Sequence, residues 1–515
     1  MKSSKVELIE ELQKRVEDKI LEPTNFELLK KLIERADTLD EAIMIAELGT
    51  TYKRTGFHFD KRLEKVTDTI KYFKKNEELS FVTDSAKKTH KLIIGDNYPA
   101  LLNLLIEYKG AIDVIYIDPP YGKDSMGEFA ETNYENAITR DNLLSMLYPR
   151  LLLAKNLLSA NGVIFCSIDD KNQAYLKCLF DEVFDEKNTE TMIWHKVDND
   201  SGKLKVTHRF RCEHEYILVA YKNKEVNRFN KYLQERNYKN TYTNPDNDPR
   251  GPYKQGIISD TEEKSSTNSP NYYSITTPSG KVYTRRWRVS REEMEELIND
   301  NRIYFGKKQD SVPSLKVFIN ERGLTTPVSI LENLGTAKTA GIELNSIFNE
   351  EIFKYPKPKE LIKHLIYISS MSNEIKVLDF FSGSGTTGQS VLELNKENKD
   401  FQAKFILVTN NEITDKNPNG IAYDVTTKRL KRVMTGECYD GTKDFKWLEN
   451  NAPLGDNLDV YEIAEVANFE ATESKTPFDV IDETLYGVEK FATIQEKVEW
   501  VCDNFETMQK KLEEN

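Results

Sequence analysis

Short runs of consecutive aliphatic and β-branched residues alternate with amphipathic stretches in two blocks of this chain. The stretches 113–117, 162–168 and 404–409 consist mostly of such residues and aromatic ones. Uninterrupted apolar runs of this length are typical of strands in a parallel sheet that is covered on both faces. The stretch 140–158 between two of them has the apolar spacing of a helix. We therefore expect an α/β fold with a mostly parallel, doubly wound sheet.

The N-terminal part has a different pattern. Residues 1 to about 85 place apolar side chains at helical spacing, and Leu63, Val66, Ile70 and Phe73 repeat the spacing of one helix face. This region is interpreted as an appended helical module.

Two further regions interrupt or follow the α/β pattern. Residues 222–345 are rich in Asn, Tyr, Pro and Gly and show only short β-like runs, so they are interpreted as an insert. The strand-like run 214–221 just before the insert is assigned to the first sheet. From about residue 428 onward, amphipathic helical stretches are expected again, among them 494–512.

Composition limits the class of protein. The chain has 515 residues, of which 38% are hydrophobic and 30% charged, and no apolar run approaches the about 20 residues of a membrane helix. Its five cysteines form no Cys-x-x-Cys pair and its start has no signal-peptide core. We expect a soluble, cytoplasmic protein with no membrane association and no metal site. The net charge of −13 means that contact with nucleic acid would require a local basic face.

The sequence Asp118-Pro119-Pro120-Tyr121 ends the apolar run 113–117. Neither proline can donate to a strand ladder, so the strand stops at an edge where ligands bind in open α/β sheets. The Asp118 carboxylate and the Pro119 carbonyl are acceptors suited to the two hydrogens of an exocyclic NH₂ group, and Tyr121 offers a stacking face. Such acceptors stabilise the charge that develops on an amine when it attacks an electrophile. The motif predicts a pocket for a planar ring that carries an amine, although a strand that merely ends in a Pro-Pro turn is the structural alternative.

A second motif, Gly383-Ser384-Gly385-Thr386-Thr387-Gly388, follows an apolar strand that ends at Asp379. It matches Gly-x-Gly-x-x-Gly, and Glu412 follows the next strand where an acid could bind ribose hydroxyls. This pattern alone fits a dinucleotide oxidoreductase and an S-adenosylmethionine enzyme equally well. Hydride transfer has no use for the amine pocket at Asp118, whereas methyl transfer needs both motifs.

Five segments together carry a resemblance to a known family. They are Gly95-Asp96-Asn97, residues 118–121, residues 214–219, Tyr355-Pro-Lys357-Pro, and residues 379–385. With them the chain resembles amino-methylating DNA methyltransferases of the permuted β group, and specifically the modification subunit of Type III restriction–modification systems. The match covers most of the chain from about residue 85 onward.

The resemblance implies a Rossmann-like, permuted S-adenosylmethionine-dependent methyltransferase fold with an inserted target-recognition domain. It implies that Asp118, Pro119, Pro120 and Tyr121 receive a flipped-out base. It also implies that Glu412 binds the ribose of the cofactor, that Asp96 binds its adenine, and that the glycine turn approaches its methionine end. The full set of expected cofactor-binding residues is Asp96, Asn97, Lys357, Asp379, Phe381, Ser382, Gly383, Ser384, Gly385, Thr386 and Glu412.

With this resemblance the chain is expected to have five parts. They are an N-terminal helical extension (1–85), a first methyltransferase half with the Asp-Pro-Pro-Tyr motif (86–221), a target-recognition domain (222–345), a second half with the cofactor motif (346–435), and a C-terminal extension that could contact a dimer mate or partner (436–515). The implied partners are double-stranded DNA, a second copy of the chain in a homodimer, and a restriction helicase–nuclease (Res) subunit.

Within the insert, Arg285, Arg286, Trp287 and Arg288 form a basic run that contains an aromatic residue, a composition typical of contacts to phosphates and base edges. We expect these four residues to bind DNA, although a solvated charged face would have the same composition.

Three functions remain open. Asp before Pro-Pro resembles the adenine-N6 enzymes more than the cytosine-N4 enzymes, so adenine N6 is the expected target and cytosine N4 the alternative. A second possibility is a DNA-recognition and assembly subunit that positions a restriction nuclease and has weak activity of its own. The third is methylation of RNA or protein amines by the same pocket. The chain has no Walker-type Gly-x₄-Gly-Lys-Ser/Thr motif, so DNA cleavage would need a separate subunit.

Overall fold

The computed structural model describes residues 4–17, 21, 23–48, 69–121, 140–197, 210–232, 241–321, 323–369, 372, 374–467 and 475–506. The chain divides into two compact units, Met1–Asp60 and Lys61–Asn515. The first unit contains helices α1 (Lys5–Glu17), α2 (Pro23–Arg35) and α3 (Leu39–Leu48). Their apolar faces form a separate core, because side chains three or four positions apart lie on the same face of a helix. Its large buried side chains include Leu8, Leu12, Phe26, Leu29 and Ile33.

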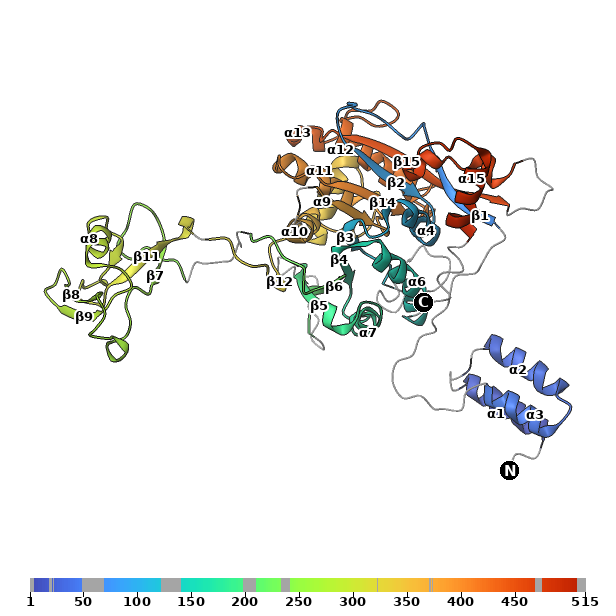
Figure 1. Ribbon diagram of the computed structural model, residues 1–515, viewed down its shortest axis with the longest axis horizontal. Coiled ribbons are helices and arrows are strands. Elements are labelled where there is room, and N and C mark those ends of the chain that lie inside the picture. Colours follow the sequence, from blue (N-terminus) through green and yellow to red (C-terminus); the bar gives the residue numbers. More distant parts are fainter. Residues whose placement is uncertain are drawn as a thin grey trace. The chain divides into compact units, whose positions relative to one another are not determined.

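Ten strands of the second unit form one sheet (Figure 1). These strands are β1 (Thr69–Lys75), β2 (Thr89–Ile94), β3 (Ile112–Ile117), β4 (Leu158–Ile168), β5 (Thr189–His195), β6 (His214–Tyr221), β12 (Ile330–Leu331), β13 (Lys376–Asp379), β14 (Lys404–Thr409) and β15 (Asn457–Ala467). Their spatial order is β1-β15-β2-β14-β13-β3-β4-β6-β5-β12. All neighbours from β15 to β4 are parallel, whereas β6 runs antiparallel to both β4 and β5.

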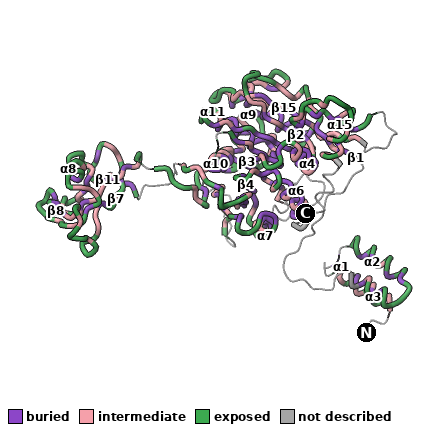
Figure 2. Tube along the Cα trace, in the orientation of Figure 1, coloured by how far each residue is buried: buried purple, intermediate pink, exposed green. Residues whose placement is uncertain are grey.

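Two groups of helices pack within this unit. The first group, whose members contact one another, is α4 (Asn97–Tyr108), α6 (Arg140–Leu157) and α7 (Gln173–Phe184). The second is α9 (Ala337–Phe348), α10 (Lys359–Ser369), α11 (Thr386–Glu397) and α12 (Thr427–Thr435). The second group shares one core with alternate strand residues such as Leu92, Val114 and Phe165. The central strands are accordingly buried along their length, as Figure 2 shows.

The predicted fold class is confirmed: the sheet is Rossmann-like and mostly parallel, and the chain order is permuted because the glycine strand β13 comes late in the sequence. The assignment of residues 214–221 to the first sheet is also confirmed, since β6 pairs with β4 and β5. β2 and β3 follow one another in sequence with α4 between them, yet β14 and β13 lie between them in the sheet.

The helix predicted through Ile70 and Phe73 is wrong, because both residues lie in strand β1, which pairs antiparallel with β15. Leu63 and Val66 lie outside the described residues. The C-terminal region likewise contributes the long strand β15 as well as the expected helix α15 (Ile494–Val501). In both cases pairing between distant segments decided the structure over the local apolar spacing.

Within the insert, residues 253–318 contain two small sheets and one α-helix, whereas β12 and the start of α9, which also fall in the range 222–345, belong to the main sheet and its core. One sheet has the order β10 (Ile303–Tyr304), β11 (Ser314–Phe318), β7 (Tyr253–Gly256), and the other pairs β8 (Tyr272–Thr276) with β9 (Val282–Arg286). Helix α8 (Arg291–Asn299) begins after Ser290, whose side chain accepts a hydrogen bond from the backbone of Glu293. In the part of the chain that the structure describes, no helix combines the length and apolar character that a membrane span needs.

Candidate active site

The carboxyl ends of four adjacent parallel strands bring the sequence motifs together. β2, β14, β13 and β3 are consecutive in the sheet. Asp96, Glu412, Asp379 and Asp118 lie at or just beyond their respective ends. From β13 the chain continues to β14 on one side, whereas from β3 it continues to β4 on the other. A crevice at such a reversal of strand order is where open α/β sheets bind ligands.

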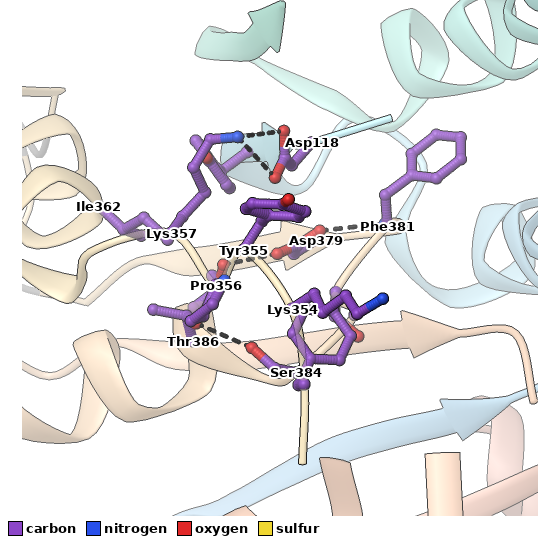
Figure 3. A pocket seen from close by; sticks show the side chains of 15 residues that line it. Asp118, Lys354, Tyr355, Pro356, Lys357, Ile362, Asp379, Phe381, Ser384 and Thr386 are labelled. Carbon is purple, nitrogen blue, oxygen red and sulfur yellow. Dashed lines mark hydrogen bonds and ion pairs between the residues drawn. The ribbon is translucent and has the colours of Figure 1, made fainter. Parts of the chain in front are cut away.

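A cavity of about 140 Å³ lies between the ends of β13 and β3 (Figure 3). Its walls contain residues of both sequence motifs and of the segment before α10. Among the predicted site residues, the cavity is lined by Asp118, Lys357, Asp379, Phe381, Ser382, Gly383, Ser384 and Thr386. Side chains of Tyr116, Phe353, Tyr355 and Ile362 supply apolar surface. The structure therefore joins the amine motif and the glycine motif in one cavity.

Lys357 holds the carboxylate of Asp118 (Figure 3). Its Nζ donates to both carboxylate oxygens, at 2.8 and 2.9 Å, and to the hydroxyl of Tyr121 at 2.7 Å. The Tyr121 hydroxyl donates in turn to Asp118 Oδ1 at 2.9 Å. Burial raises the pKa of Asp118, and the charge of Lys357 opposes this shift without cancelling it. The sequence analysis predicts Lys357 as a cofactor-binding residue, so its contact with Asp118 was not expected.

Glu215 completes this cluster, and its role was not predicted. Because β6 runs antiparallel to β4, its first residues lie at the edge where the parallel strands end. Glu215 Oε2 lies 3.4 Å from Lys357 Nζ and accepts from the Tyr121 hydroxyl at 3.2 Å, and Oε1 accepts from Lys196 Nζ at 3.0 Å. Burial acts to raise the pKa of Glu215, but the charges of Lys357 and Lys196 outweigh it and lower the pKa. Only the position of Glu215 at the start of the strand 214–221 could have signalled this contact.

The two prolines and the backbone of Tyr121 fix the end of the motif. Pro119 is buried and Pro120 is half-buried. The carbonyl of Tyr121 accepts a hydrogen bond from the Asn172 side chain at 2.7 Å. Lys357 Nζ also lies 4.9 Å from the centre of the Tyr121 ring. Because the same Nζ is 2.7 Å from the hydroxyl oxygen, the cation lies at the hydroxyl end of the ring and not over its face.

The glycine turn is organised by Asp379. Its Oδ1 accepts from the backbone N–H of Phe381 at 3.0 Å and its Oδ2 from the Thr387 hydroxyl at 2.5 Å. Burial raises the pKa of Asp379 to about 7. Gly383 and Gly385 have φ values of +46° and +78°, which residues with a side chain adopt at a cost.

Arg429 supports the turn from behind and was missed in the sequence, where it is one of several basic residues in α12. Its side chain is buried, and Nη1 donates to the Ser384 carbonyl at 3.2 Å, to the Ser384 hydroxyl at 3.1 Å and to the Thr386 hydroxyl at 2.8 Å. Burial lowers the pKa of Arg429 to about 10. The Ser382 hydroxyl bonds to the Val408 carbonyl at 3.0 Å, so the turn is also tied to β14.

The predicted residues at β2 and β14 lie beside the turn and not in the cavity wall. Asp96 caps α4 by accepting from the Tyr98 backbone, and its carboxylate is 3.1 Å from Arg150. The Asn97 side chain donates to the backbone carbonyl just before Phe381 at 2.9 Å. Burial raises the pKa of Glu412 to about 7, and its buried Oε1 has no hydrogen-bond partner among the described residues.

The basic run of the insert is divided by the fold. Trp287 is 1% exposed and its indole N–H donates to the Tyr273 carbonyl at 2.8 Å, so it is a core residue of the insert. Its prediction as a DNA contact is wrong in this structure, because a base could not reach the ring. Arg286 and Arg288 are exposed, and Arg286 pairs with Asp260 at 3.2 Å. Arg285 is half-buried.

The chain is similar in sequence to a protein family and to several characterised proteins. The sequence model of a family described as DNA methylase matches residues 112–413, more than half of the chain, and a family described as an uncharacterised conserved protein matches residues 4–114. The chain is 29% identical to the Type III restriction-modification enzyme StyLTI Mod subunit of Salmonella typhimurium, over 73% of this chain and 63% of that protein. It is 27% identical to the EcoP15I Mod subunit of Escherichia coli, over 70% of this chain and 66% of that protein. The chain thus spans just under two thirds of the length of these relatives. A solved structure of a DNA modification methylase described as putative, from Thermus thermophilus in complex with S-adenosyl-L-methionine, aligns with a TM-score of 0.32 and 15% identity, over 72% of this chain and 99% of that chain.

Proposed function

Because the chain belongs to the DNA methylase family, we propose that it transfers a methyl group from S-adenosylmethionine to the N6 amine of a flipped-out adenine in double-stranded DNA. The observation that carries this proposal is the shared cavity: Asp118, at the end of β3, and the glycine turn after β13 line the same space. A methyltransferase has to hold an amine and a methyl donor in line within bonding reach. The adenine preference rests on Asp118 preceding Pro119-Pro120, with cytosine N4 as the alternative.

The residues present fit S-adenosylmethionine. Gly383 and Gly385 have the positive φ values of a tight glycine turn, the kind of turn with which glycine-rich loops at strand ends bind nucleotide-like ligands. Glu412 has a buried oxygen without a partner among the described residues, and a ribose hydroxyl could donate to it. Asp379 and Phe381 would face the methionine end. When bound, the cofactor supplies a methyl group on a positively charged sulfur.

The chain's own residues would prepare the amine. A base must leave the duplex to reach the cavity, at a cost of a few kcal/mol. Asp118 and the Pro119 carbonyl would accept the two hydrogens of the exocyclic amine, and Tyr121 would stack on the ring. As the nitrogen gains the methyl group it becomes cationic, and Asp118 stabilises that charge and accepts the proton that leaves. The raised pKa of Asp118 favours this proton transfer.

The similarity to Mod subunits extends the proposal to the assembly. We propose that residues 222–345 form the target-recognition domain, with Arg285, Arg286 and Arg288 contacting DNA. We also propose that the chain acts in the cytoplasm as the modification and recognition subunit of a Type III restriction–modification enzyme, forming a homodimer and binding a Res subunit through parts such as 436–515. Support for this step comes from the names of the relatives and from the length of sequence they share with the chain.

The test is methyl transfer from labelled S-adenosylmethionine to genomic DNA of varied sequence, followed by identification of the modified base. N6-methyladenine at one short motif is expected with the native chain and not with Asp118→Ala. Asp113→Ala, at the opposite end of the same strand, is the matched control and should retain activity. N4-methylcytosine in place of N6-methyladenine would select the alternative target. Binding of cofactor and DNA without any transfer would contradict the proposal and favour the assembly role.

A further inference from the structure

In this structure Lys357 is bonded to the Asp118 carboxylate, one of the two acceptors that the proposed mechanism assigns to the target amine. Its ammonium group lies within 2.9 Å of both oxygens of Asp118 and within 2.7 Å of the Tyr121 hydroxyl. An ammonium resembles the cationic amine that forms during methyl transfer, so it satisfies the same carboxylate. Lys357 and the Tyr121 hydroxyl together leave Asp118 one acceptor position, on Oδ2, among the described residues. A base amine and Lys357 therefore compete for the carboxylate, and the amine gains its full contact with Asp118 only when Lys357 withdraws.

The cluster contains a second carboxylate to which Lys357 can move. Glu215 Oε2 lies 3.4 Å from Lys357 Nζ, so a small rotation of the long lysine side chain brings the two into full contact. A lysine released without another anion would leave a charge in a site where its side chain is only 12% exposed, which is costly. The side chain of Glu215 is itself 13% exposed.

We propose that Glu215 is a positioning residue that receives Lys357 when the target amine takes its place on Asp118. This inference rests on the proposed function and goes beyond it, because it assigns a role to a residue outside both sequence motifs. The four charges of the cluster, on Asp118, Glu215, Lys357 and Lys196, sum to zero. Lys357 can therefore change partner without altering the net charge of the site.

Two further contacts hold the Glu215 carboxylate next to Lys357. Lys196 holds Oε1 at 3.0 Å, and the hydroxyl of Tyr121 bonds to Oε2 at 3.2 Å. The tyrosine hydroxyl thus contacts Lys357 and both carboxylates. Lys196 competes with Lys357 for Glu215, so removal of Lys196 should strengthen the attraction of Glu215 for Lys357.

The test measures how much the target amine contributes to DNA binding. Duplexes carry either adenine or purine, which lacks the 6-amino group, at the target position of the motif found by methylation mapping, and their Kd values are compared without cofactor. The ratio of the purine Kd to the adenine Kd should fall about tenfold or more in Glu215→Gln. In Glu213→Gln, a carboxylate two positions earlier that pairs with Arg211, the ratio should not change.

A double-mutant cycle shows whether Glu215 acts through Lys357. In a Lys357→Met background, Glu215→Gln should change the ratio less than about twofold, since no lysine needs to be received. Lys196→Met should raise the ratio, which a merely structural role of the cluster would not do, and this variant serves if Glu215→Gln does not fold. An unchanged ratio in Glu215→Gln, an equal effect in both backgrounds, or a lowered ratio in Lys196→Met would overturn the inference while the native chain still methylates DNA. A native chain that methylates no DNA overturns the proposed function and this inference together.

Discussion

Replacing Asp379 by asparagine should stabilise the folded protein at pH values above about 7 and leave its stability unchanged near pH 4. The side chain is 2% exposed, and burial raises its pKa from 3.8 to about 7. In the unfolded chain the same carboxyl ionises near its ordinary pKa. Between these two pKa values the folded protein binds more protons, so its stability falls as the pH rises and the loss is complete above the folded pKa.

The size of the effect follows from the two pKa values. The difference between about 7 and 3.8 is about 3 units, and each unit corresponds to about 1.4 kcal/mol, so the ionised carboxyl costs about 4 kcal/mol. Asparagine has the same shape and does not ionise. Its oxygen can still accept from the Phe381 N–H, and its amide can donate to the Thr387 hydroxyl, which now acts as the acceptor. The exchange therefore removes the cost of ionisation and keeps both hydrogen bonds.

Urea unfolding of the native chain and of Asp379→Asn at several pH values between about 4 and 8 measures the effect. The free energies of unfolding should coincide at the acid end and separate progressively toward the alkaline end. Asp113→Asn is the control, because Asp113 also accepts one backbone and one hydroxyl hydrogen bond, at the opposite end of the sheet. A difference between the native chain and Asp379→Asn that does not vary with pH would refute the reasoning, since it would mean that Asp379 is already ionised near its ordinary pKa in the folded protein.

Three further outcomes are expected. Lys357→Met removes the charge that opposes the raised pKa of Asp118, so methyl transfer should decline at neutral pH and recover partly as the pH rises; a pH–rate profile of the same shape as that of the native chain would contradict this. Gly385→Ala places a side chain at φ +78°, which should cost about 1–2 kcal/mol of stability and weaken S-adenosylmethionine binding in a calorimetric titration, whereas unchanged cofactor affinity would count against the turn as the cofactor site. Trp287→Ala should destabilise the insert by about 3–5 kcal/mol in thermal unfolding, while Arg288→Gln should leave stability unchanged and lower the salt dependence of DNA affinity by about one ion; the reverse pattern would restore Trp287 as a DNA contact.

The sequence predicts most of the strands and helices of the α/β unit, but it does not predict which strands lie next to each other in the sheet. The apolar runs predict β3, β4 and β14 correctly, because strands that are buried on both faces consist of nearly continuous apolar residues. Nothing in the order of β2 and β3 along the chain indicates that β14 and β13 lie between them. The three-residue spacing of Ile70 and Phe73 predicts a helix, and only the distant partner strand β15 shows that both residues lie in strand β1.

Some residues of the candidate site can be located from the sequence, whereas others depend on how distant segments pair. Asp118 and Asp379 could be located because each follows a recognisable strand and precedes a distinctive turn. Glu215 could not, since its contribution depends on β6 running opposite to β4, and strand direction is set by the fold as a whole. The prediction for Trp287 is wrong for a different reason. The arginines around Trp287 suggest a surface contact, but the small sheets of the insert need an aromatic core and bury its ring.

Burial disfavours the ionised form of two carboxyl groups in the site, and a cationic ligand beside them would offset this effect. Asp379 and Glu412 follow adjacent strands, and burial raises both pKa values to about 7. Neither forms an ion pair among the described residues, in contrast to Asp118 and Glu215, which share Lys357. A ligand with a positively charged sulfur and ammonium group near Asp379, and with hydroxyls near Glu412, would stabilise the ionised forms and lower both pKa values. By reciprocity, ionisation of Asp379 and Glu412 would strengthen the binding of such a ligand, so the affinity for the proposed cofactor should rise as the pH rises through about 7.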